Sequence, residues 1–191
     1  GFRNPKWNER KSFNMKKIIL LIFAILISCN NNKKSSQNEE LDYYDLIGDF
    51  SRSEYANHPF LKDSFNINYN DYKLDVTTIN NIKPYLENDL KIKIIMGTWC
   101  DDSRLLVPQF LKVMDKLKFK KNKIEFIGLD HEKNSPYDHD KIYEIINVPT
   151  IIFYKNDMEF NRIVELTIET LEKDILSILS DSGYENAYYG F

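Results

Sequence analysis

Residues 91–179 alternate strand-like and helix-like patterns and then close with a hairpin, and this order constrains the fold more than any other feature of the chain. Short apolar runs rich in β-branched residues indicate strands, and apolar side chains recurring at helical spacing indicate helices. Such alternation followed by a hairpin predicts a mixed sheet with helices on both faces. The expected elements are a strand over 91–96, a helix over 101–118, a strand over 123–129, a short helix over 141–146, hairpin strands over 151–154 and 159–165, and a helix over 168–179.

The stretch ahead of this alternation, residues 41–87, is expected to be a helical N-terminal extension. Asp75 is a candidate N-cap for one of its helices, and Pro84 disturbs the end of that helix. The tail over 182–191 is aromatic and receives no assignment. Within the extension, the pattern is loosely helical over 41–58, rich in Asn and Asp and therefore expected to loop over 57–72, and helical over 76–82.

Three sequence features stand out among the predicted strands and helices. They are Trp99-Cys100-Asp101-Asp102-Ser103 between the first strand and its helix, Pro108 inside that helix, and Val148-Pro149-Thr150 before the hairpin. Their joint spacing over residues 92–179 resembles the thioredoxin family, in which a Trp-Cys-x-x-Cys motif faces a cis-proline loop. The resemblance implies an α/β, thioredoxin-like three-layer fold over 88–181, with a central mixed sheet and helices on both faces.

Cys100 is the candidate catalytic nucleophile. A thiolate is the species that attacks disulfides, and the start of a helix favours an anion through its unpaired N–H groups. The resemblance implies that Pro149 is cis and faces Cys100. Val148 and Thr150 would then bind an extended substrate with it by main-chain hydrogen bonds. Trp99 is expected to shield one side of the thiol.

Ser103 is the largest departure from the family, because it stands where the second cysteine belongs. Cys100 alone can form a mixed disulfide, but an external thiol must resolve it. Ser103 remains able to donate a hydrogen bond to the Cys100 thiolate. Asp101 and Asp102 oppose thiolate formation by their charge, and Arg104 offsets them in part, so these three residues are expected to tune the thiol.

Two further positions differ from the family pattern. Ile94 occupies the place of a buried acid that many thioredoxins carry six residues before the cysteine. Its loss removes a proton acceptor, which is consistent with the absence of a resolving thiol. Glu165 occupies a position near the substrate groove where glycine is usual, so the groove is expected to be altered.

The N-terminal residues read as a lipoprotein signal. A positive start at Met15 leads into an apolar run over 18–27, which is too short to span a bilayer but fits a secretory signal. The run ends Leu26-Ile27-Ser28-Cys29, which resembles the lipobox of bacterial lipoproteins. A signal anchor with an incidental cysteine is the alternative. The expected partition is an upstream segment and signal over 1–28, the lipidated Cys29 and a flexible tether over 29–40, the extension, the thioredoxin-like domain and the tail.

With lipid on Cys29, Cys100 becomes the only free thiol of an exported protein, which marks it as reactive or as pairing with another molecule. The expected function is membrane-anchored thiol–disulfide exchange in the bacterial cell envelope, with exported proteins or low-molecular-weight thiols as partners. The alternative is a redox-inactive binding module that uses the cis-proline groove.

Other classes of function find little support in the sequence. A formal charge of -3 without a basic stripe argues against nucleic acid. No cofactor is expected, because a Gly-rich phosphate loop is missing. The acidic and histidine-containing stretches at 130–132 and 138–140 are expected to be solvated loops, so no metal is expected either. Gly97 stands where a peroxiredoxin would need Thr or Ser.

Overall fold

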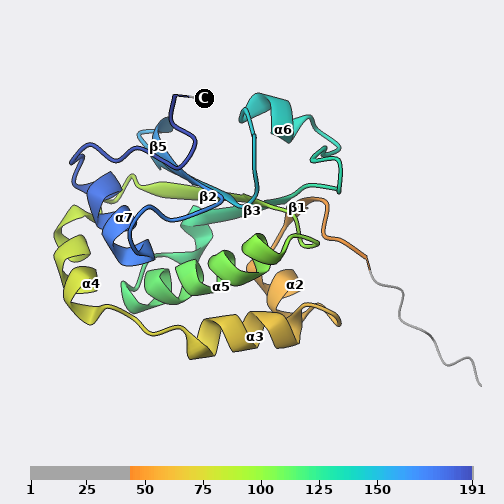
Figure 1. Ribbon diagram of the computed structural model, residues 1–191, viewed down its shortest axis with the longest axis horizontal. Helices are drawn as coiled ribbons and strands as arrows, with labels where there is room; N and C mark the ends of the chain where they lie inside the picture. The colour runs from red at the N-terminus through yellow and green to blue at the C-terminus, as the bar shows by residue number, and fades with distance from the viewer. Residues whose placement is uncertain (1–43, 191) are drawn as a thin grey trace, which may run out of the picture. The chain divides into compact units, whose positions relative to one another are not determined.

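A mixed five-stranded sheet forms the centre of the protein, whose computed structural model describes residues 44–190. The strand order is β1-β3-β2-β4-β5 (Figure 1). β2 runs parallel to β3, and the other neighbouring pairs are antiparallel. The strands are β1 Gly48–Phe50, β2 Lys91–Met96, β3 Ile124–Gly128, β4 Thr150–Lys155 and β5 Met158–Val164.

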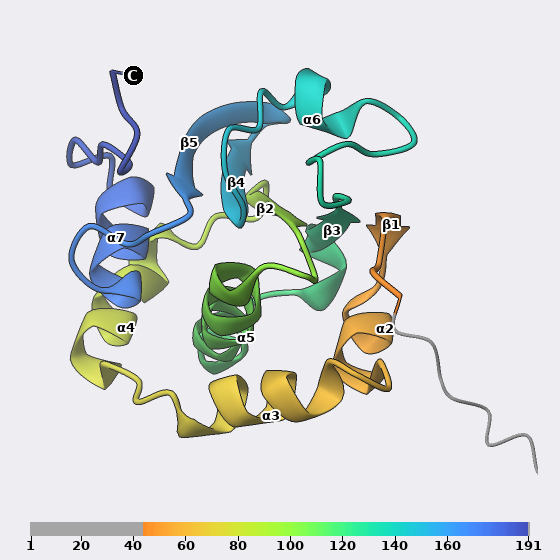
Figure 2. The same ribbon diagram turned by 45° about the vertical axis from the view of Figure 1, so that its right-hand side comes forward.

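The long helices lie on one side of the sheet and the short α6 lies on the other (Figure 1, Figure 2). α5 packs against the sheet, and α3 packs on α5. The helices are α2 Arg52–Asn57, α3 Lys62–Asp71, α4 Val76–Ile82, α5 Asp101–Lys116, α6 His139–Ile142 and α7 Leu171–Leu179. Short 3-10 turns cover Lys83–Tyr85 and Lys121–Lys123. Within the described residues, none of the helices combines the length and the apolar character that a membrane crossing requires.

Two hydrophobic clusters flank the sheet, because side chains along a strand alternate between its faces. Ile92 and Ile94 belong to the large cluster shared with the long helices. Ile95 belongs to a smaller cluster on the opposite face. Trp99 and Cys100 pack against this smaller cluster, so the thiol motif lies where the second core meets solvent.

The predicted order of elements over 91–179 is confirmed, with two shifts. α6 covers four residues, His139–Ile142, rather than 141–146. Glu144 has a left-handed φ of 51°, which ends the helix before the predicted segment is complete. α7 begins at Leu171 rather than at 168, because the Thr170 side chain caps it by accepting a hydrogen bond from the Lys173 N–H.

The predicted helix over 41–58 is wrong in its first part, where the described residues instead form β1 and only then α2. Gly48 has a φ of 76°, which is incompatible with a helix. The strand fits because Gly128 opposite has no side chain: a Cβ on Gly128 would lie 1.7 Å from the carbonyl oxygen of Leu46. α2 starts at a capping box formed by Ser51 and Glu54.

The predicted loop over 57–72 is also wrong, because residues Lys62–Asp71 form α3. Its Asn and Asp residues are weak helix formers, and tertiary packing outweighs that preference. Phe65 is buried, with its ring 5.1 Å from that of Tyr55. The Tyr69 hydroxyl donates to Asp115 of α5, which also accepts from Arg52. Both segments therefore belong to the main core.

Candidate functional site

Cys100 lies at the N-cap of α5, with an extended backbone (φ -83°, ψ 127°). Its thiol donates to the carbonyl oxygen of Val148 at 3.4 Å. The side chain is half-buried, and it is the free cysteine of the described residues. The unpaired N–H groups of the first turn of α5 lie beside it.

The loop facing the thiol contains a cis peptide bond between Val148 and Pro149, which confirms the cis geometry expected for Pro149. The carbonyl oxygen of Pro149 accepts from the Glu165 N–H at 2.7 Å, and the Thr150 hydroxyl donates to the Asn147 carbonyl at 2.6 Å. These bonds tie the loop to the start of β4 and the end of β5. Among the described residues, the Val148 N–H has no hydrogen-bond partner.

Trp99, the first residue of the thiol motif, packs against the smaller cluster and is held on several sides. Its indole N–H donates to the Leu129 carbonyl at 3.0 Å. One part of the ring covers Gly97, where a Cβ would lie only 2.5 Å from the indole. The imidazole of His131 stacks on the indole, with ring centroids 4.9 Å apart. Gly97 is thus required here for close approach.

Asp45 connects the N-terminal segment to this motif. Its carboxylate accepts from the Thr98 hydroxyl at 2.8 Å and pairs with His131 Nε2 at 3.1 Å. The Leu46 N–H in turn donates to the Thr98 hydroxyl at 3.1 Å. The loop that precedes Cys100 is therefore held in part by residues that precede the first strand.

The first turn of α5 carries the four residues that follow the thiol. Ser103 is fully buried, and its hydroxyl has no hydrogen-bond partner among the described residues, so it does not donate to Cys100 here. Arg104 forms an ion pair with Asp101. Asp102 is exposed and takes part in no ion pair of the described residues.

Glu165 follows β5 directly and has a left-handed φ of 59°. Its Oε2 accepts from Asn147 Nδ2 at 3.0 Å and from the Tyr188 hydroxyl. Tyr188 belongs to the C-terminal tail, so the tail reaches the cis-proline loop. The pKa of the Tyr188 phenol is raised, first by the hydrogen bond with Glu165 and also by the charge of Asp102.

The structure brings Cys100 of the thiol motif into contact with Val148 of the cis-proline loop, and it adds neighbours that sequence reasoning missed. His131 had a usable signal: it follows β3, whose end lies at the same sheet edge as the end of the parallel strand β2. Asn147 adjoins the predicted loop. Asp45 and Tyr188 gave no local signal, because they reach the site only through the tertiary fold.

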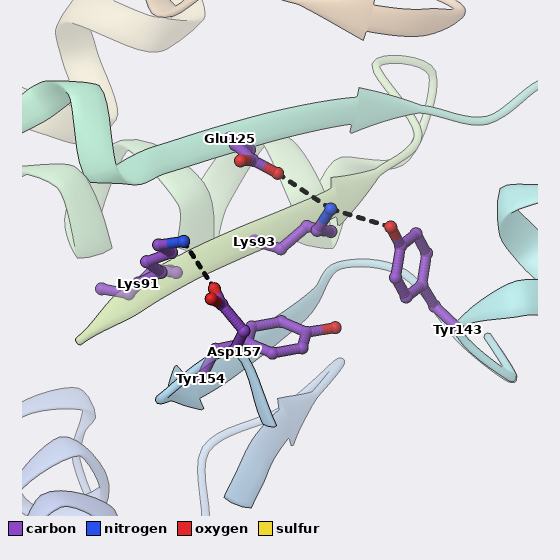
Figure 3. A pocket seen from close by; sticks show the side chains of 7 residues that line it. Lys91, Lys93, Glu125, Tyr143, Tyr154 and Asp157 are labelled. Carbon is purple, nitrogen blue, oxygen red and sulfur yellow. Dashed lines mark hydrogen bonds and ion pairs between the residues drawn. The ribbon is translucent and has the colours of Figure 1, made fainter. Parts of the chain in front are cut away.

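A separate pocket of about 200 Å³ lies along β2, away from the thiol motif (Figure 3). Lys93 lies between Glu125 and the Tyr143 hydroxyl, each 2.8 Å from its ammonium (Figure 3). Burial lowers the pKa of Lys93, but these two partners outweigh it and leave the pKa raised. The polar groups here satisfy one another, and they hold the loop that carries Tyr143 on the sheet.

The two acidic and histidine-containing stretches form no metal centre. In residues 44–190, no group of three His, Cys, Asp or Glu side chains has the arrangement to hold a metal ion. His131 of the first stretch instead belongs to the Trp99 contact. His139 of the second begins α6 and stacks on Tyr143.

Comparison with known proteins finds one family model and several solved structures that are similar to this chain. The family model described as thioredoxin matches residues 75–177. A crystal structure of a protein of unknown function from Pseudomonas aeruginosa is similar with a TM-score of 0.52 at 14% identity, over 72% of this chain and 95% of that chain. The similarity extends to mitochondrial thioredoxin 3 from Saccharomyces cerevisiae, with 24% identity, a TM-score of 0.31 and coverage of 47% of this chain and 76% of that chain. For the thioredoxin pre-protein of Schistosoma mansoni, the identity is 23%, the TM-score 0.36, and the coverage 52% and 89%. None of the curated proteins matches the chain.

Proposed function

This chain belongs to the thioredoxin family, and from that premise we propose that it is a membrane-anchored protein of the bacterial cell envelope that exchanges thiols and disulfides through Cys100 alone. The thioredoxin-like fold supports a function of the thiol–disulfide oxidoreductase type in general. The use of a single thiol and the exported location are the two features proposed for this chain in particular.

The contact between Cys100 and Val148 carries the proposal. The half-buried thiol meets the carbonyl oxygen of Val148 across a loop with cis Pro149, at the start of a sixteen-residue helix. The N–H of Val148, a residue that is 2% exposed, has no hydrogen-bond partner among the described residues. In the proposed function an extended substrate binds this donor in the manner of an added strand. The backbone proposed to bind the substrate therefore lies next to the nucleophilic sulfur.

The exchange is written as two balanced steps. The Cys100 thiolate attacks one sulfur of a substrate disulfide, which forms a mixed disulfide and releases the other sulfur as a thiolate. Ser103 has no sulfur with which to displace the substrate. A thiolate from a low-molecular-weight thiol or a partner protein then attacks the mixed disulfide, regenerates the Cys100 thiolate and leaves with the substrate sulfur in a new disulfide.

The anchor rests on the N-terminal sequence, which lies outside the described residues. Leu26-Ile27-Ser28-Cys29 resembles a lipobox, and the polar stretch 30–40 that follows suits a tether. Exported proteins or small thiols are the proposed partners.

The exchange is tested with the full chain carrying Cys29→Ser, so that Cys100 is the only thiol. Incubation with bis(hydroxyethyl) disulfide should add one hydroxyethylthio group to Cys100 in the intact mass, and reduced glutathione should remove it. Cys100→Ser in the same background is the control and should gain no mass. If the folded protein forms no adduct but the urea-unfolded protein does, the thiol is inert in the native fold and the exchange function is wrong.

That negative result would favour a second function from another class, a binding module that uses the cis-proline groove without chemistry. The exposed carboxylate of Asp102 and the serine at position 103 are the observations in its favour. Such a module predicts that Cys100→Ser retains every partner of the native chain.

A further inference from the structure

The backbone at Glu165 is unusual for a residue of its type. Its φ of 59° lies in the left-handed region, which residues with a Cβ rarely adopt. The resemblance to thioredoxins places glycine at this position, and glycine would hold the same conformation without strain. Seven other non-glycine residues of the described chain also have a positive φ, so the contacts of the Glu165 side chain, rather than its backbone alone, indicate a use for it.

The side chain is fixed next to the cis-proline loop. The Glu165 N–H binds the carbonyl oxygen of Pro149, and Oε2 accepts from both Asn147 and Tyr188. The other oxygen, Oε1, has no hydrogen-bond partner among the described residues. The loop that Glu165 binds also contacts the Cys100 thiol. A fixed carboxylate with one oxygen free of hydrogen bonds to the described residues therefore lies against the same loop that contacts the thiol.

Glu165 forms no ion pair in the described part of the chain. Lys133 shares Asn147 with it, but the Lys133 ammonium donates to the Ile146 carbonyl at 2.7 Å and to Asn147 Oδ1 at 2.9 Å rather than to Glu165. Arg104 pairs with Asp101. Asp102, whose charge acts on the same Tyr188 phenol, adds a second negative charge on the helix side.

We propose that Glu165 is a specificity-determining residue, whose carboxylate selects substrates that carry a positive charge next to the reactive sulfur. An ammonium or a basic side chain beside a disulfide has this chemistry. The inference rests on the proposed exchange at Cys100, and it concerns which substrates are favoured rather than whether exchange occurs.

Charged methanethiosulfonates test the preference directly, because they modify thiols by a single step. The Cys100 thiolate attacks the sulfenyl sulfur, the S–S bond to the sulfonyl sulfur breaks, and methanesulfinate leaves. The rates of the trimethylammonioethyl, sulfonatoethyl and uncharged methyl reagents are measured on the full chain carrying Cys29→Ser. The ratio of cation to anion rates is compared between folded and urea-unfolded protein.

The folded protein should favour the cationic reagent, and Glu165→Gln should lower the ratio about fivefold, because one carboxylate attracts the cation and repels the anion. Glu165→Asp should keep the preference. The rate with the uncharged reagent reports how far the loss of the carboxylate changes formation of the Cys100 thiolate, and this change cancels in the ratio of cation to anion rates. High salt should reduce the ratio. Glu87→Gln is the matched control, because it also removes one carboxylate, which pairs with Lys155. Glu87 lies before the start of β2 and Cys100 lies after its end, so the two residues are at opposite ends of this strand.

An equal ratio in the native chain and in Glu165→Gln would overturn the selection by charge. Adducts with bis(hydroxyethyl) disulfide would still support exchange at Cys100 in that case. Conversely, a charge preference without any exchange would leave the carboxylate's role intact and remove the proposed chemistry.

Discussion

His131 stacks on the indole of Trp99, with ring centroids 4.9 Å apart and ring planes inclined by 22°. We expect His131→Ala to expose one face of the indole and to lower the free energy of unfolding by about 0.5–1 kcal/mol, the contribution of an aromatic pair. Acrylamide quenching of Trp99 fluorescence should increase. A Trp7→Phe background leaves Trp99 as the only tryptophan.

His139→Ala is the matched control, because His139 also stacks on an aromatic ring, that of Tyr143, without contact to Trp99. Asp45→Asn should increase quenching less than His131→Ala does, because it removes the carboxylate that contacts His131 but keeps the imidazole on the indole. Equal quenching in His131→Ala and the parent would mean that the imidazole does not cover the indole in solution.

Gly128→Ala should displace the segment that precedes β1. The added Cβ would meet backbone, the carbonyl oxygen of Leu46, which cannot rotate away, so we expect a loss of about 1–3 kcal/mol in unfolding free energy. Gly97→Ala offers a contrast, because its Cβ would meet the Trp99 side chain. Urea unfolding should show the larger loss at 128, and Trp99 fluorescence the larger change at 97. The reverse order would contradict the placement of the N-terminal segment.

The ion pair between Arg52 and Asp115 should make stability depend on pH. Burial raises the pKa of Asp115, but hydrogen bonds from Arg52 and Tyr69 outweigh it and hold the pKa below its usual value. The stabilisation is therefore present above the unfolded pKa of about 3.9 and is lost as the pH falls through the lower folded value. Asp115→Asn should cost about 1–3 kcal/mol at neutral pH, because Arg52 and Tyr69 lose a charged partner.

Urea unfolding of the parent and of Asp115→Asn at about pH 7 and about pH 3 checks this linkage, with the gap between the two proteins narrowing in acid. Asp157→Asn is the control, because Asp157 pairs with Lys91 at an exposed position and its loss should change stability little. A difference in unfolding free energy that stays constant or widens in acid would contradict the lowered pKa of Asp115.

Cys29 is predicted to carry the membrane anchor. The full chain expressed in a bacterium should partition into the detergent phase after phase separation of a Triton extract, and Cys29→Ser should move it to the aqueous phase, because acyl chains supply the apolar surface that drives partitioning. Cys100→Ser should partition like the parent. Retention of Cys29→Ser in the detergent phase would favour an uncleaved signal anchor.

Features with a local signature were predictable from the sequence. The strand that ends before Gly97, the helix that opens at Asp101 and the hairpin after Pro149 each have a periodicity or a turn residue of their own. The thiol motif and the cis-proline loop were predictable because their spacing is a joint pattern. These elements also carry most of the candidate site.

Features that depend on distant partners were not predictable. β1 has only three residues and exists because it pairs with β3. α3 is stabilised by burial of Phe65, and this contribution cannot be read from the Asn and Asp content that led to the prediction of a loop. Asp45 and His131 are far apart in the sequence and meet only around Thr98 and Trp99. In each case tertiary contacts decide what local propensity leaves open.

The pairing of β1 with β3 limits how far the chain can be shortened from its N-terminal side. The segment that matches the family, 75–177, begins after β1, α2 and α3. A chain cut to that segment would leave β3 as a bare edge strand with unpaired backbone groups opposite Phe126 to Gly128. Exposed edges of this kind recruit further strands and lead to aggregation. By pairing with β3, the three residues of β1 cover an edge that could otherwise pair with another copy of the chain.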